Sequence, residues 1–395
     1  MTAATRPEYF DCETRRQSVQ VVLLAPTAVT ATAAECDCLP ASLSAPVERG
    51  KTTTADSAPE KWWFMYRPYL FFYCAELLSQ FGADVIRIEK LSGSEDRYTT
   101  PVTEDGQGAL FLQMNCNKRG ITLNPTRPEG REVVKKLVAT ADVVLANLPP
   151  PTLVEMGIDY KSLKAIKEDI IFTTVSAFGS VGPYSDRLGF DGIGQAMSGA
   201  VHMGGFPGQP IKSYAPYVDF GTATSAALGT LVAIMARQQT GKGQVVEGAL
   251  LRTALCYSNS LMIEQVLLDL NRTGTGNRAQ NAGPGNIFNT KDGAVIIQVI
   301  GQPLFARWTK LVGADEWLDD PRFATDALRG ENGAIISERA AAWCGERTTE
   351  QVLAECEAAR VPSGPVLTAQ QAAAHRHLGN TPMRSCLRLA IPPRK

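Results

Sequence analysis

Three short runs rich in Val and Ile constrain the fold of this chain more than any other feature. They cover residues 84–88, 142–146 and 170–175, and helix-like segments separate them. Strands that are apolar on both faces and alternate with helices predict a parallel sheet covered by helices on both sides. Such a sheet binds ligands beyond the carboxyl ends of its strands.

Asn147 directly follows the second of these runs. The end of the expected strand would place its side chain at the ligand-binding edge of the sheet. An Asn that only forms a turn explains the residue equally well, because Asn is common where a chain changes direction. Both interpretations stay open from the local sequence.

Composition and periodicity divide the chain into four segments. Residues 1–60 are rich in Ala, Thr, Ser and Pro, and we expect them to be poorly ordered. Residues 61–272 carry the sheet pattern of a large domain. Residues 273–375 carry a hairpin signal and short helical patterns, which predict a smaller α+β domain, and residues 376–395 form a tail. Helices are expected at residues 74–80, 128–138, 160–167, 222–238, 251–270, 303–311, 335–344 and 350–359.

Asp219 is the strongest candidate for chemistry, since it lies directly before the helix expected at 222–238. A carboxylate there meets unpaired backbone N–H groups and the positive end of the helix dipole. The same donors would stabilise an oxyanion formed at that place. Taken alone, however, Asp219 is better explained as a helix cap.

Two sets of neighbours accompany Asp219. The expected helix is amphipathic, with apolar residues at helical spacing: Leu228, Leu231, Val232 and Met235. Small residues at its start would let a ligand approach closely: Gly221, Ala223 and Ser225.

Composition excludes several classes of protein. The formal net charge is −1 and Lys and Arg form no run, so we expect no nucleic-acid partner. Three histidines are too few to favour a zinc hydrolase or a Ser-His-Asp hydrolase. The nine cysteines lack metal-type spacing, so we expect reduced thiols in a cytoplasmic protein and no metal site.

Three further alternatives are set aside. We judge no stretch long and apolar enough to span a membrane, so no membrane partner is expected. Residues 19–34 resemble a signal peptide, but Pro26 interrupts the run and acidic residues precede it, so we do not expect export. Residues 274–279 fit the string GxGxxA, yet they follow an expected helix and precede a strand, which is the wrong order for NAD binding.

Several strings, in order along residues 77–378, together resemble the class III CoA-transferases. That family includes formyl-CoA and carnitine CoA-transferases and the related acyl-CoA racemases. Each string is weak alone, and their order makes the resemblance specific. They are GADVIRIE at 82–89, NCNKRGI at 115–121, ADVV at 141–144 with Asn147, SAFG at 176–179, GPY at 182–184, Asp191 with QAMSG at 195–199, Asp219, TGKGQ at 240–244, DPRF at 320–323 and VPSGPV at 361–366.

The resemblance implies a fold and a chemistry. The fold is α/β, an open Rossmann-like and mostly parallel sheet with a second, smaller α+β domain, and two subunits form an interlocked homodimer. Asp219 is then the nucleophile that forms an aspartyl-CoA thioester while CoA passes from an acyl-CoA to a carboxylic acid. No cofactor is permanently bound, and the CoA thioester is a substrate.

The resemblance also implies contacts to CoA. They fall on Lys90, Leu123 and Asn147, with Lys118 and Arg119 nearby, and we include Asp191 among the binding candidates. Cationic side chains suit the phosphates of CoA. An adjacent Lys-Arg pair is also common as a merely solvated surface feature.

Two alternatives to a transferase are carried forward. A racemase would need acid–base groups on both faces of the α carbon, and Phe190 stands where that branch has a His before Asp191. A catalytically impaired relative is the other alternative, because aromatic residues occupy 62–72, where the family has its first strand and an Ala-Gly-Pro turn. Pro149 likewise replaces the usual Arg after Asn147. An ordinary core strand would also explain the aromatic run.

Overall fold

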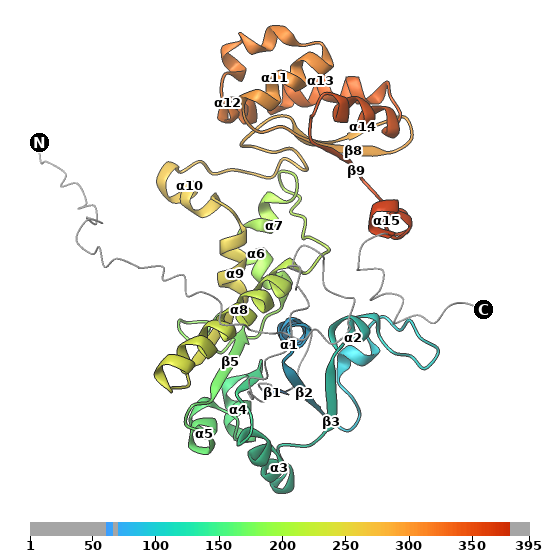
Figure 1. Ribbon diagram of the computed structural model, residues 1–395. Coiled ribbons are helices and arrows are strands. Elements are labelled where there is room, and N and C mark those ends of the chain that lie inside the picture. Colours follow the sequence, from blue (N-terminus) through green and yellow to red (C-terminus); the bar gives the residue numbers. More distant parts are fainter. Residues whose placement is uncertain (1–60, 66–69, 380–395) are drawn as a thin grey trace, which may run out of the picture.

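A six-stranded parallel sheet forms the base of the molecule, as the alternating runs predict (Figure 1). The computed structural model describes residues 61–65 and 70–379, so the expectations for residues 1–60 and for the end of the tail lie outside the described residues. The strands lie in the order β3-β2-β1-β4-β5-β6. They are β1 (Lys61–Met65), β2 (Asp84–Glu89), β3 (Lys118–Thr122), β4 (Val143–Ala146), β5 (Ile171–Ser176) and β6 (Val245–Ala249).

The aromatic run contributes the central strand. β1 pairs in parallel with β2 on one side and with β4 on the other. In the backbone register, Trp63 is paired with Ile86 of β2 and with Val144 of β4. The ordinary strand interpretation of this run is therefore confirmed for residues 61–65. β3 and β6 were missed because they are edge strands with polar residues and lack the apolar signature of a strand buried on both faces.

Alternate residues of the central strands feed two separate cores. Val143 and Leu145 of β4 point to the side covered by α1 and α8, whereas Val144 and Ala146 point to the side covered by α3, α4 and α5. This follows from the two-residue period of a strand. The helices of the two layers are α1 (Leu70–Gln80), α3 (Pro128–Val138), α4 (Pro150–Met156), α5 (Tyr160–Ile166) and α8 (Tyr217–Thr240).

Helix α8 begins earlier than predicted and packs through the opposite face. Its buried residues are small, among them Gly221, Ala223 and Ala227, and they let α8 lie close against α1 and the sheet. The long apolar side chains that identified the helix point outward instead, with Leu228 64% and Met235 63% exposed.

The prediction that no stretch could span a membrane was too strong, because α8 is long and apolar enough. However, 56% of its most apolar window is buried, which is also found in core helices of soluble proteins.

The long helix predicted at 251–270 is two helices. α9 (Leu250–Tyr257) and α10 (Leu261–Leu268) are separated by a bend in which Asn259 has a φ of 59°. That left-handed backbone angle is incompatible with a continuous right-handed helix, and Asn tolerates it better than most residues. Further short helices of this part are η1 (Glu95–Tyr98), α2 (Ala109–Met114), α6 (Asp191–Met197) and α7 (Ala200–Met203).

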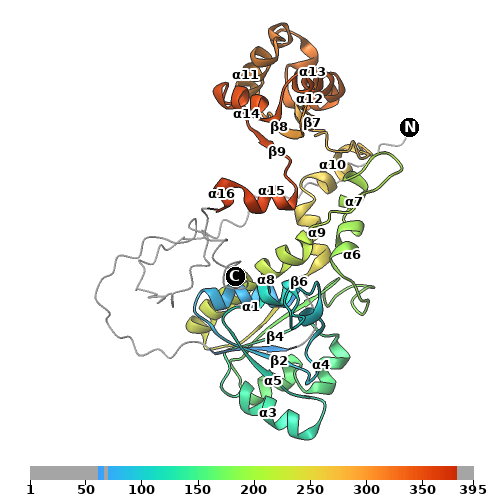
Figure 2. The same ribbon diagram turned by 90° about the vertical axis from the view of Figure 1, so that its right-hand side faces the viewer.

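A smaller α+β unit lies beyond α10, with its own core (Figures 1 and 2). Its antiparallel sheet has the order β7-β8-β9, and the predicted hairpin turn joins Asn289 of β7 to Ala294 of β8. Buried aromatic rings, among them Phe305, Trp308 and Phe323, fill the space between sheet and helices. The elements are β7 (Gly285–Asn289), β8 (Ala294–Gln298), α11 (Gln302–Val312), η2 (Asp315–Leu318), η3 (Pro321–Phe323), α12 (Asp326–Glu331), α13 (Gly333–Gly345), α14 (Thr349–Ala358), β9 (Ser363–Pro365), α15 (Ala369–Ala374) and α16 (Arg376–Gly379).

The central position of β4 leads to a stability prediction. Leu145 is fully buried, so Leu145→Ala should lower the free energy of unfolding by about 3 kcal/mol, through lost burial and the cavity left behind. Leu188, which is 80% exposed, offers the control, and Leu188→Ala should change stability by less than about 0.5 kcal/mol. Urea unfolding of both variants measures the difference. Equal effects would contradict the placement of β4 in the core.

Candidate active site

Asp219 lies in the first turn of α8, and another carboxylate caps that helix. Asp191, at the start of α6, accepts hydrogen bonds through Oδ2 from the backbone N–H of Val218 at 2.9 Å and of Asp219 at 3.0 Å. The residue before the helix, Pro216, makes no side-chain cap. The cap interpretation of Asp219 is therefore wrong, and its carboxylate is left for another role.

The cap is itself held in place by a buried amide. Gln195, one turn along α6, donates to Oδ1 of Asp191 through Nε2 and accepts from the backbone N–H of Ser213 through Oε1 at 3.0 Å. Asp191 and Gln195 are only 7% and 1% exposed. The two side chains thus fasten α6, the loop before α8 and the first turn of α8 to one another.

Burial dominates the electrostatics of Asp219. Desolvation, and then the nearby negative charge of Asp191, raise the pKa of Asp219 to about 7. Burial and the same charge of Asp191 also raise the pKa of Tyr217. A carboxylate with such a pKa is more basic than an ordinary one and a stronger nucleophile when ionised.

Aromatic rings flank the start of α8. Tyr73 of α1 meets Phe220 with 4.8 Å between ring centroids, and Tyr257 of α9 stacks on Tyr217 at 6.5 Å. The space that Gly221 leaves open is taken by Tyr257, since a Cβ built there would lie 2.3 Å from the ring. The expectation that Gly221 opens room for a ligand is therefore corrected: it opens room for a side chain of the same chain.

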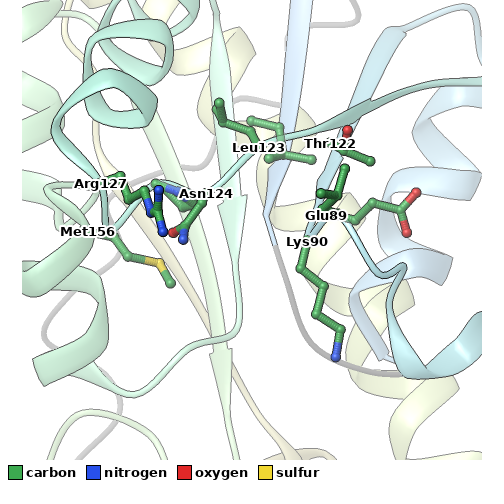
Figure 3. Close-up of a pocket in the computed structure, with 10 residues that line it drawn as sticks. Glu89, Lys90, Thr122, Leu123, Asn124, Arg127 and Met156 are labelled. Atoms are coloured by element: carbon green, nitrogen blue, oxygen red, sulfur yellow. The ribbon is translucent and has the colours of Figure 1, made fainter.

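A cavity of about 680 Å³ lies beyond the carboxyl ends of β2 and β3, at the edge where a parallel sheet binds ligands. Figure 3 shows Lys90, Thr122 and Leu123 on one side, with Asn124, Arg127 and Met156 on the other. Lys90 and Leu123, both predicted from the resemblance, are brought together here. Asn147 follows the carboxyl end of β4 and so belongs to the same edge of the sheet.

Lys118 and Arg119 lie elsewhere. They begin β3 and therefore sit at the opposite, amino end of the strand. Arg119 is ion-paired with Asp84 at the start of β2, and its Nε lies 2.9 Å from Oδ1 of that residue. Nζ of Lys118 donates to the backbone oxygens of Phe72, at 2.7 Å, and Met114. Burial lowers the pKa of Lys118 to about 7.

The cavity has cationic and apolar lining that the sequence did not reveal. Arg127 was missed because it reads as a loop residue before a helix. The available signal was Pro128, which starts α3 directly after it and so places Arg127 near the carboxyl end of β3. Met156 is the last residue of α4, and its side chain lines the cavity as well.

The remaining candidates are placed as follows. His202, one of the three histidines, is exposed on α7 and lines a second cavity of about 400 Å³ together with Leu261 and Arg272. Phe190 is 63% exposed and carries no proton. Within residues 61–65 and 70–379, no group of three or more His, Cys, Asp or Glu side chains could hold a metal ion.

Known proteins with similar sequences are CoA-transferases. A succinyl-CoA–D-citramalate CoA-transferase of Chloroflexus aurantiacus is 36% identical over 308 residues, covering 77% of each chain. A succinate–glutarate CoA-transferase of Agrobacterium fabrum is 31% identical, covering 74% of this chain and 76% of the relative.

The fold also has a solved counterpart. The crystal structure of a CAIB/BAIF family protein from Brucella suis matches with a TM-score of 0.69 and 30% identity, covering 81% of this chain and 86% of the other. The family model described as CoA-transferase family III matches residues 69–386. On its sequence and its fold, the chain belongs to CoA-transferase family III, and it is a CoA-transferase.

Proposed function

We propose that this protein transfers CoA from an acyl-CoA donor to a carboxylic acid through a covalent intermediate on Asp219. One observation carries the proposal: Asp219 is a half-buried carboxylate, with its pKa raised to about 7, in the first turn of a helix that a different carboxylate caps. Family membership supports the same reaction. A carboxylate that only capped a helix or lay on the surface would need neither the burial of Asp219 nor the fixed backbone around it.

The proposed reaction needs no external proton or electron. The Asp219 carboxylate attacks the thioester carbonyl carbon, the C–S bond breaks, and CoA thiolate leaves a mixed anhydride. The thiolate then attacks the carbonyl carbon of Asp219, which releases the donor acid and forms the aspartyl-CoA thioester. The acceptor carboxylate then attacks the carbonyl carbon of the aspartyl-CoA thioester and expels CoA thiolate, which leaves a second mixed anhydride. The thiolate attacks the acceptor's carbonyl carbon in that anhydride, which forms the new acyl-CoA and frees the Asp219 carboxylate.

CoA would bind across the carboxyl edge of the Rossmann-like sheet. Lys90 and Arg127 supply positive charge for its phosphates, and Leu123 and Met156 supply an apolar wall for its base. Asn147 would contact the part of CoA that extends along this edge. We do not extend the proposal to Lys118 and Arg119, because their partners lie at the amino end of β3.

Dicarboxylic acids are the acceptor class that the relatives favour. The Chloroflexus and Agrobacterium relatives are named for succinyl-CoA or succinate together with D-citramalate or glutarate. We therefore propose succinyl-CoA as the first donor to test, against a panel of dicarboxylic acids. The scattered cysteines are consistent with our proposal of a cytoplasmic enzyme.

The covalent step can be trapped. Asp219→Asn should lose nearly all transfer, by about a thousandfold or more, because the amide cannot form the anhydride. Wild-type protein incubated with succinyl-CoA and then hydroxylamine should carry a hydroxamate on the peptide containing Asp219, detected by mass spectrometry. An unmodified peptide in a protein that still turns over would sink the mechanism.

The pH dependence follows from the raised pKa. Only the ionised carboxylate attacks, so kcat/KM should be half-maximal near pH 7 and fall about tenfold for each pH unit below it. Asp191→Asn keeps an oxygen to cap α8 but removes the charge, so the half-maximal pH should move downward. A profile that is flat between pH 5 and 8 in wild-type protein would contradict this assignment.

We also propose that two subunits form an interlocked homodimer. Its support is the exposed apolar side of α8, with Leu228 and Met235, and of α10, where Val266 is 81% and Leu267 73% exposed. Contiguous exposed apolar patches of this kind mark interaction sites.

Dilution tests this assembly. If the subunits are interlocked, mass photometry at nanomolar concentration should find dimers, because separation requires unfolding. Leu228→Glu should abolish the dimer or lower the yield of folded protein. Val154 is 64% exposed on the opposite helix layer, so Val154→Glu should do neither. A wild-type chain that dissociates readily to folded monomers would count against the proposal.

A further inference from the structure

A cluster of buried charges lies under the segment that follows β2. Arg87 of β2 donates to both carboxylate oxygens of Asp96, each at 2.8 Å, and to Oδ1 of Asn115 at 2.7 Å. The side chains of Arg87 and Asp96 are 3% and 1% exposed. Glu89, two residues after Arg87 and also 3% exposed, lies 3.3 Å from the same guanidinium.

The cluster holds the segment 90–99 from several sides. Glu89 accepts from the backbone N–H of Ser94 at 3.1 Å and from Nε of Arg97 at 2.9 Å. The ring of Phe111, on α2, lies 5.1 Å from the guanidinium carbon of Arg87 and 4.1 Å from that of Arg97. Both ends of η1 are thereby tied to the end of β2.

The start of this segment lines the large cavity. Lys90 and Leu91 line it next to Glu89 at the end of β2, and Nζ of Lys90 is 2.7 Å from Oε1 of Glu95 within the segment. The direction in which Lys90 leaves the sheet therefore depends on a loop that the buried charges fix.

Buried ion pairs are poor sources of net stability, because the cost of removing charges from water roughly cancels their attraction. Their geometric demands are strict, however, since a guanidinium and a carboxylate pair best in one bidentate arrangement. A cluster of this kind is better suited to select a single loop conformation than to stabilise the fold.

We propose that the Arg87–Asp96 pair is a positioning element for CoA binding, which holds residues 90–99 as a preformed wall of the cavity. This inference rests on the proposed function, because it assigns CoA to that cavity. Asp96 does not touch the ligand. It acts through the backbone of η1 and through the loop that carries Lys90 and Leu91.

The experiment compares two Arg–Asp pairs of the same chain in which the Arg is buried; Asp96 is 1% exposed and Asp326 31%. Asp96→Asn is close in shape but removes the carboxylate that pairs with Arg87 in a bidentate arrangement, and only the more distant Glu89 then opposes the charge of Arg87. The matched control is Asp326→Asn in the small unit, where Nη1 of Arg329 lies 2.8 Å from Oδ1 of Asp326 and the Arg329 side chain is 1% exposed. Melting temperature, CoA affinity by calorimetry, and kcat and KM for succinyl-CoA are measured for both variants. Amide hydrogen exchange reports on residues 90–99.

We expect Asp96→Asn to raise the Kd for CoA and the KM for succinyl-CoA about tenfold, a loss of about 1.4 kcal/mol in binding, with kcat nearly unchanged. Amides of residues 90–99 should exchange faster in this variant. Asp326→Asn should lower the melting temperature but leave Kd, KM and this exchange as in wild-type protein. Asp96→Glu, which retains the charge, should recover part of the CoA affinity.

Three results would overturn the inference. Faster exchange in residues 90–99 with an unchanged Kd for CoA would mean that the loop does not serve the cavity. Unchanged exchange in Asp96→Asn would mean that the pair does not hold the loop, whether or not the protein transfers CoA. Equal losses of CoA affinity in Asp96→Asn and Asp326→Asn would mean that the Arg87–Asp96 pair only supports the fold in general. If CoA binds to wild-type protein without turnover, the proposed reaction fails while the positioning role is still decided by affinity and exchange.

Discussion

The hydrogen bonds from the first turn of α8 to Asp191 are the interaction on which the site depends. They bring a second carboxylate to the helix that carries Asp219, the proposed nucleophile, without using Asp219 itself. The backbone N–H groups at a helix start must find an acceptor, and here that acceptor is Asp191 of α6. Because α6 supplies that acceptor, Asp219 is left half-buried beside a like charge, and its pKa rises.

The same helix explains where the sequence pattern failed. Periodicity located α8 correctly, yet it assigned Leu228 and Met235 to the wrong environment, because a helical stripe of large apolar residues does not say which partner covers it. Within one chain the close packing against α1 and the sheet requires the small residues instead. The large residues are left on the outside, where only a further surface could bury them.

Much of the parallel sheet could be predicted, and the binding edge only in part. β2, β4 and β5 carry apolar runs because both of their faces are covered, whereas the edge strands β3 and β6 carry no such mark. Lys90 and Leu123 were assigned to CoA only through the family resemblance, and the structure brings them together because β2 and β3 end at the same edge of the sheet. Lys118 could not be placed, since sequence does not tell which end of an unrecognised strand a residue occupies. Arg127 had an indirect local signal in Pro128, whereas the Asp191 cap depends on tertiary contacts that no local pattern encodes.

The small sheet has a consequence for how the enzyme could be rebuilt. The chain enters it on β7 and leaves on β9, and these strands flank β8. Both are antiparallel to β8, so the exit at Pro365 is level with Phe288, three residues along from the entry at Gly285; two strand spacings across and three residues along make a separation of roughly 14 Å. A unit attached through two nearby points is modular: another compact unit with similarly spaced ends could be grafted between α10 and α15 without disturbing α8, which carries Asp219, or the sheet beneath it. Natural variation in the length of this region would be tolerated for the same reason.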